Sequence, residues 1–156
     1  MTTQVTWYGH AALGIETGGK FLLFDPYLTG NPVATVKPDA LNPGYILISH
    51  GHGDHVGDAP DIAKRTGAML ISNFEICSWF ETKHGHGSVH AQHIGGGFNY
   101  DFGRVKLIGP RVVIPIHYNT FDLLTQDAHE WARRVSSASQ DKTQVVVLSP
   151  GQSFSL

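Results

Sequence analysis

The sequence predicts one α/β sandwich domain spanning residues 1–156. Expected strands alternate with expected helices, and clusters of Gly, Pro, Asn and Asp separate them. The runs "YILIS" (45–49) and "AMLIS" (68–72) are apolar nearly throughout, which is typical of strands covered on both faces. A chain of 156 residues is long enough for one core and short for two domains.

The elements follow from local signals. The expected strands are residues 5–9, 13–17, 20–24, 45–49, 68–72, 111–119 and 143–148, with a short closing strand near residue 156. Helices are expected over 58–65, over 74–83 and over 127–137, and a hairpin over 98–107. Gly67 is a plausible end for the first helix and Asn73 a cap for the second. Pro115 lies inside a strand and argues for an edge or a bulge there.

Composition narrows the class of protein. Apolar residues make up 41% of the chain, charged residues 15%, and the formal net charge is −2, so nothing in the charge favours nucleic acid or an anionic membrane as partner. Cys77 is the only cysteine and is expected in the core, which excludes an intrachain disulfide and fits a reducing compartment. We read no secretory signal and no apolar run near the ~20 residues of a membrane span. We therefore expect a cytoplasmic protein with a small-molecule substrate, and a homo-oligomer is compatible with this.

One loop concentrates chemistry. The stretch "ILISHGHGDHVGDA" (46–59) brings together His50, His52, Asp54 and His55 directly after a buried strand. In extended backbone the first two histidines point to the same side, and the intervening glycines allow the chain to bend sharply around one point. Imidazole and carboxylate suit zinc, and also iron and manganese. A glycine-rich surface turn with incidental histidines is the alternative interpretation.

The loop resembles the His-x-His-x-Asp-His motif of the metallo-β-lactamase superfamily. The segments "VTWYGHAALGIETGGKFLLFDPYLTGNP", "ISNFEI", "HIGGGF" and "VVIPIHYNTFDLL" are similar to its metal-dependent hydrolase subgroup, which is similar to the ascorbate-6-phosphate lactonases. The resemblance covers nearly the whole chain and implies an αββα sandwich. It implies that His50 and His52 bind a first metal, that Asp54 and His55 bind a second, and that His117 joins them. Taken alone, His117 on an apolar strand is more often a satisfied core residue.

The resemblance breaks in one place. A histidine in an "A-x-H-S" segment and an aspartate in a "G-D-T" segment are absent, and a central block of the family is missing near Leu107 and Ile108. Either the protein itself lacks this block, or the printed sequence leaves out residues that the protein has between Leu107 and Ile108. We favour omission, because a shortened domain would leave strand edges unpaired. A Cα separation well above ~3.8 Å at this point would show it. Without the block, Asp54, His55 and His117 could still hold one metal.

Other residues have two interpretations each. His10 and Asp25 end strands and could support the metal ligands from behind, or they could be a structural histidine and an Asp-Pro turn. His-rich "KHGHGSVHAQH" (83–93) could bind metal, although a solvated loop is favoured. Next to His117, Tyr118 and Asn119 could touch substrate or serve in capping and packing. The expected exposed face of the last helix consists of Asp127, Glu130, Arg133 and Arg134.

These observations predict a metal-dependent hydrolase. One or two divalent ions, zinc first and manganese or iron as alternatives, would lower the pKa of bound water to ~7 and supply hydroxide. Asp54 would bind metal and assist proton transfer. The resemblance implies an ester or lactone substrate. The alternatives are a phosphodiesterase of the same fold, or a degenerate member that binds metal or ligand without turnover.

Overall fold

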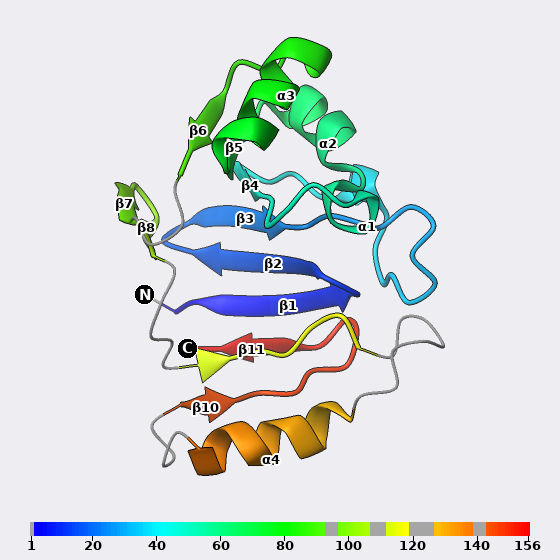
Figure 1. The fold of residues 1–156 in the computed structure, drawn as a ribbon, viewed down its shortest axis with the longest axis vertical. Helices are drawn as coiled ribbons and strands as arrows, with labels where there is room; N and C mark the ends of the chain where they lie inside the picture. The colour runs from blue at the N-terminus through cyan, green and yellow to red at the C-terminus, as the bar shows by residue number, and fades with distance from the viewer. Residues whose placement is uncertain (1, 93–96, 107–111, 119–126, 139–142) are drawn as a thin grey trace.

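A seven-stranded sheet runs through the molecule in the order β11-β1-β2-β3-β4-β5-β6, and the pairs β9-β10 and β7-β8 lie beside it (Figure 1). The computed structural model describes residues 2–92, 97–106, 112–118, 127–138 and 143–156. The strands of the large sheet are β1 (Gln4–Gly9), β2 (Ala12–Thr17), β3 (Lys20–Phe24), β4 (Tyr45–Leu47), β5 (Met69–Ser72), β6 (Val89–Ala91) and β11 (Ser153–Ser155).

Strand direction places three strand ends at one edge. β1, β2 and β3 form antiparallel hairpins, and β4, β5 and β6 continue parallel to β3. Because β2 reverses the chain once between them, β1 and β3 run the same way. The carboxyl ends of β1, β3 and β4 therefore meet at the same edge, which is where ligands bind in open α/β sheets.

The helices are η1 (Pro38–Ala40), α1 (Gly53–Val56), α2 (Ala59–Thr66), α3 (Phe74–His84) and α4 (Ala128–Ala138). Of these, α2 and α3 cover one face of the seven-stranded sheet. Ile62 of α2 and Phe80 of α3 share one buried cluster with Leu23, Ile46 and Leu70 of the sheet. Helix α4 lies against β10, away from the other helices (Figure 1).

The opposite face is covered by the hairpin of β7 (Gly97–Tyr100) and β8 (Gly103–Lys106). Phe102, at the turn of this hairpin, packs on a second buried cluster of Leu22, Leu47 and Ile71. Asp101, also at the turn, accepts a hydrogen bond from the hydroxyl of Tyr45 at 2.6 Å. The sheet is thus buried on both faces near β3, β4 and β5, which confirms the α/β class and the interpretation of the apolar runs.

The predicted helix signals are confirmed. Helix α2 ends at Gly67, whose φ of 69° is left-handed, a conformation that glycine adopts without a side-chain clash. Asn73 caps α3, since its side-chain oxygen accepts the N–H of Ile76 at 2.9 Å. The expected exposed face of α4 is found, with Glu130 paired to Arg133 at the surface. Cys77 is buried, as expected.

Four elements differ from the prediction. The turn that carries Asp54 and His55 is the short helix α1, and the stretch interpreted as a solvated loop contains β6. Conversely, the expected strands 111–119 and 143–148 are reduced to β9 (Val112–Val113) and β10 (Gln144–Val145). Pro115 has no N–H for a strand ladder, so pairing stops before it.

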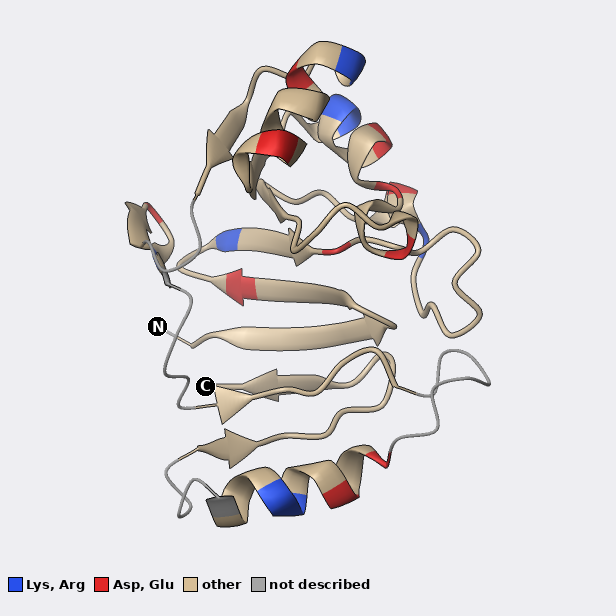
Figure 2. Ribbon diagram, in the orientation of Figure 1, with Lys and Arg blue, Asp and Glu red and all other residues tan. Residues whose placement is uncertain are grey.

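Charged residues gather on α2, α3 and α4, with both signs mixed (Figure 2). No helix in the described part of the chain combines the length and the apolar character that crossing a membrane would require.

Candidate metal centre

The candidate site lies at the sheet edge where the strand ends meet. His10 follows β1, Asp25 follows β3, and the loop that carries His50 to His55 follows β4. His117 reaches the same place from the segment after β9, and its backbone N–H donates to the carbonyl of His10 at 2.7 Å. Residues more than a hundred positions apart are therefore joined directly.

Four side chains form a cluster: His10, Asp54, His55 and His117. One potential ligand atom from each lies within 4.8 Å of all the others. The Oδ2 atom of Asp54 is the centre of this arrangement. It lies 2.9 Å from Nε2 of His10, 3.4 Å from Nε2 of His117 and 4.0 Å from Nε2 of His55. Three imidazole nitrogens thus surround one carboxylate oxygen.

Asp25 supports His55 from behind. Its Oδ2 lies 2.9 Å from Nδ1 of His55, and it also accepts the hydroxyl of Ser49 at 2.5 Å. Its other oxygen accepts the backbone N–H of Ser49 at 2.7 Å. A carboxylate bonded to Nδ1–H fixes the imidazole tautomer, which leaves Nε2 of His55 free to face Asp54.

Backbone geometry at the cluster is unusual. His10, Asp25 and His117 have φ angles of 52°, 38° and 68°, in the left-handed region that disfavours side chains. The carbonyl of His10 accepts hydrogen bonds from His117 N–H and from the indole N–H of Trp7, the latter at 2.9 Å. These contacts fix the strained backbone of His10 and His117.

Burial makes the cluster asymmetric. His10, Asp25 and His55 are buried, whereas the side chains of Asp54 and His117 are 34% and 36% exposed, so the cluster opens to solvent on their side. Burial lowers the pKa of His10 below its usual value and outweighs the hydrogen bond to Asp54. Burial raises the pKa of Asp54, but hydrogen bonds from His10, the backbone and His117 outweigh it and lower that pKa overall.

The structure separates the five expected ligands. Asp54, His55 and His117 belong to the cluster, whereas His50 and His52 lie beside it. The His50 ring centroid is 3.9 Å from that of His55 and 4.6 Å from that of His52. His10, expected at most as a support, lies inside the cluster. Sequence signals for two successive hairpins could have shown the position of His10. The hairpins make β1 and β3 run in the same direction, so the residue after β1 lies at the same sheet edge as the residue after β3.

The His-rich segment does not form a second centre within the described residues. Nε2 of His86 lies 2.8 Å from the carbonyl of Ala68, and His84 packs against Trp79. His90, on β6, packs against Phe98, on β7. His93 and Asn119 lie outside the described residues.

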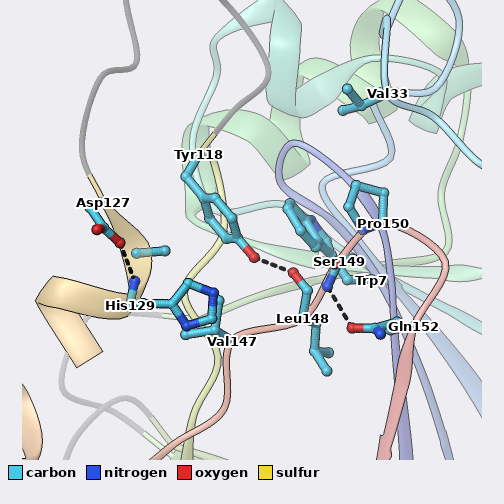
Figure 3. A pocket seen from close by; sticks show the side chains of 11 residues that line it. Trp7, Val33, Tyr118, Asp127, His129, Val147, Leu148, Ser149, Pro150 and Gln152 are labelled. Carbon is cyan, nitrogen blue, oxygen red and sulfur yellow. Dashed lines mark hydrogen bonds between the residues drawn. The ribbon is translucent and has the colours of Figure 1, made fainter. Parts of the chain in front are cut away.

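A cavity of about 670 Å³ lies next to the cluster. Its lining includes Trp7, which donates to the carbonyl of His10, and Tyr118, which follows His117 in the chain. Trp7 and Tyr118, whose ring centroids are 4.7 Å apart, stand at its wall, and the Tyr118 hydroxyl donates to the carbonyl of Leu148 (Figure 3). Asp127 and His129 face it from the start of α4 (Figure 3). Its lining residues are Trp7, Val33, Tyr118, Asp127, Ala128, His129, Val147, Leu148, Ser149, Pro150 and Gln152.

Comparison with known proteins identifies the family of this chain. A family model described as the beta-lactamase superfamily domain matches residues 4–108. A UPF0173 metal-dependent hydrolase of Methylacidiphilum infernorum is 48% identical over 106 residues, which are 67% of this chain and 46% of that protein. A similarly named protein of Methanopyrus kandleri is 30% identical over 229 aligned positions, covering 97% of this chain and 99% of that protein.

These alignments also bear on the missing block. The part of the chain that matches the relatives from Methylacidiphilum infernorum, Heliobacterium modesticaldum and Carboxydothermus hydrogenoformans spans about half the length of each of those proteins. Because it has 156 residues, at least 73 of the 229 positions aligned with the Methanopyrus protein have no counterpart here. The family model ends at residue 108, where we predicted the break. Leu107 and Ile108 themselves lie outside the described residues, so the choice between shortening and omission stays a prediction.

The fold has a counterpart among solved structures. A metallo hydrolase from the hyperthermophilic archaeon Ignicoccus hospitalis superposes with a TM-score of 0.79 at 24% identity, covering 100% of this chain and 99% of that one. This similarity concerns the fold alone, whereas the sequence matches establish the family. The chain belongs to the beta-lactamase superfamily, in the group of UPF0173 metal-dependent hydrolases.

Proposed function

We propose that this chain is a metal-dependent hydrolase that cleaves an ester or lactone at the cluster. The observation that carries the proposal is the convergence of His10, Asp54, His55 and His117 from three separate segments to within 4.8 Å. Three imidazoles and one carboxylate are a donor set that divalent zinc, manganese and iron accept. The names of the relatives support the same class of activity.

The spacing of the donor atoms fits a cation. Ligand atoms about 2.0–2.1 Å from a tetrahedral zinc ion lie about 3.3 Å from one another. The separations of 2.9, 3.4 and 4.0 Å between the three Nε2 atoms and Oδ2 of Asp54 bracket this value. Asp54, His55 and His117 would hold the ion, as expected from the sequence, while His50 and His52 are not members of the cluster.

A bound divalent cation would supply an activated water near neutral pH and a positive charge beside the reacting oxygen. The chain contributes orientation and proton handling. Asp25 fixes the ring of His55, and the Asp54 carboxylate, on the open side of the cluster, would pass a proton from water toward the leaving group. We assign Asp54 as the catalytic residue on this basis.

The cavity behind Trp7 and Tyr118 is the proposed site for the part of the substrate that does not react. Its wall combines these aromatic rings with polar groups such as His129 and Gln152, which suits a small molecule with an apolar body. We propose that the protein acts in the cytoplasm, since its one cysteine is buried and reduced there.

A second candidate is metal binding without turnover. Among the described residues, His50 and His52 have no third ligand that would complete a second ion site, and at least 73 positions of the alignment with the Methanopyrus protein have no counterpart here. A phosphodiester is the alternative substrate within the hydrolase proposal.

The test is turnover of a substrate panel by the metal-loaded protein. Lactones, carboxylic esters, thioesters and phosphodiesters are assayed with the wild-type protein, with His55→Ala and with His84→Ala, a control histidine at the end of α3 that lies outside the cluster. We expect metal-dependent hydrolysis of an ester or lactone that His55→Ala abolishes and His84→Ala retains. Bound metal without turnover of any panel member would support the second candidate.

A further inference from the structure

We propose that this chain holds one metal ion rather than two, and that His10 is a protein ligand to it. The proposal deepens the proposed function, because it rests on metal binding at the same cluster. It assigns to His10 a direct role in place of the supporting role expected from the sequence.

Several contacts fix the position of His10 beside Asp54. Its side chain is fully buried, and its Nε2 is the imidazole nitrogen nearest to Oδ2 of Asp54, at 2.9 Å. Its ring centroid lies 3.7 Å from that of His117. Its backbone carbonyl accepts hydrogen bonds from both Trp7 and His117, which fixes the main chain from which the ring projects.

The alternative interpretation of His10 is a hydrogen-bond donor to Asp54 alone. That interpretation accounts for one contact but leaves the rings of His55 and His117 facing the same oxygen. A carboxylate oxygen can accept more than one hydrogen bond, but only if each neutral ring carries its proton on Nε2. Asp25 holds the proton of His55 on Nδ1 instead, so Nε2 of His55 presents a lone pair to the centre. A cation among the four groups accommodates that lone pair.

The count of one ion follows from the neighbouring pair. His52 is exposed, and Nδ1 of His50 lies 2.9 Å from the hydroxyl of Ser49. In the described part of the chain, no other His, Cys, Asp or Glu joins these two histidines to make a group of three. Two imidazoles alone are fewer than the three protein ligands of a typical catalytic zinc site.

The experiment measures stoichiometry and affinity, not turnover. Metal-free protein is titrated with Zn²⁺, and bound zinc per chain is determined by equilibrium dialysis and mass spectrometry, for wild type, His10→Gln and the double variant His50→Gln/His52→Gln. We expect one zinc per chain. Affinity should fall in His10→Gln by more than the roughly 10–100-fold that loss of an outer supporting residue costs. The double variant should keep its stoichiometry and change affinity less than about threefold.

Because His10 is buried, His10→Gln could fail to fold. A measurement on the wild-type protein therefore tests separately whether His10 binds the ion. The imidazole nitrogens are followed by ¹⁵N NMR during zinc addition, and we expect shifts at Nε2 of His10, His55 and His117 with a plateau at one equivalent. Two zinc ions per chain, zinc loss in the double variant, or an unshifted His10 signal would overturn the proposal. One bound ion per chain with no hydrolysis in either the zinc or the manganese form would refute the proposed function and leave this inference standing.

Discussion

Replacing Asp25 by asparagine should weaken metal binding more than its effect on folding explains. Asp25 is 4% exposed and accepts three hydrogen bonds, two from Ser49 and one from His55. Asparagine has the same shape, but one of its two positions is an NH₂ donor. In either orientation one donor of the protein then faces another donor.

The magnitude follows from these contacts. A hydrogen bond to a charged group contributes about 1.5–3 kcal/mol, so the free energy of unfolding of the metal-free protein should fall by about that amount. If the NH₂ group faces His55, the imidazole must move its proton from Nδ1 to Nε2, which removes the lone pair directed at the cluster. Loss of such a supporting carboxylate typically costs roughly 10–100-fold in metal affinity, or about 1.4–2.7 kcal/mol.

The assay pairs zinc competition titration with urea unfolding of the metal-free protein. Asp58→Asn is the matched control, because its carboxylate accepts the backbone N–H groups of Leu28 and Thr29, each at 2.8 Å, and its removal changes no bond to the cluster. We expect both variants to lose stability and only Asp25→Asn to lose zinc affinity. Equal zinc affinities in the two variants would refute the role given to Asp25.

Four further predictions concern the backbone and the metal. Gly57→Ala should cost about 1–3 kcal/mol more unfolding free energy than Gly67→Ala, because a Cβ would meet backbone atoms at 2.5 Å at the first position and nothing within 4 Å at the second, although both have positive φ; equal urea midpoints would contradict this. In metal-free protein His117→Gly should be about 1 kcal/mol more stable than His117→Ala, since only glycine relieves a φ of 68°, and equal stabilities would disprove the strain. Zinc at 100 times its Kd should raise the unfolding free energy by about 2.7 kcal/mol over chelated protein. With four protein ligands a tetrahedral zinc ion has no open position, so turnover should be faster with manganese, and faster turnover with zinc would argue that one of the four is not a ligand.

Local signals in the sequence were sufficient for the helices and the ligand loop. Asn73 and Gly67 mark helix ends through their own side-chain and backbone preferences, which do not depend on distant contacts. The loop after β4 combines a buried strand with closely spaced histidines and an aspartate within six residues, from His50 to His55, and two of them, Asp54 and His55, lie in the cluster. The helix α1 escaped prediction because four residues, Gly53–Val56, are too few for a helical period.

The remaining members of the site depend on topology. His10 and Asp25 each follow a strand, and as single residues they are compatible with structural roles. Their convergence follows only once β1, β2 and β3 are read as two successive hairpins that return the chain to the same edge. The second half of the domain was predicted least well, because β9 and β10 are two residues each, where longer strands were expected.

Strain and chemistry coincide in this chain. Within the described ranges, the non-glycine residues with positive φ are His10, Asp25 and His117, and each contributes to the cluster or supports it. Such conformations cost about 1–3 kcal/mol each and persist only where surrounding contacts fix them. Here those contacts are backbone bonds that the sheet edge supplies, such as Asp25 N–H to the carbonyl of Leu47 at 3.0 Å. Glycine would remove the strain at each position and would also remove the imidazole or carboxylate. The retention of these side chains at such positions therefore argues that the edge is shaped to converge them on one point, at the expense of stability.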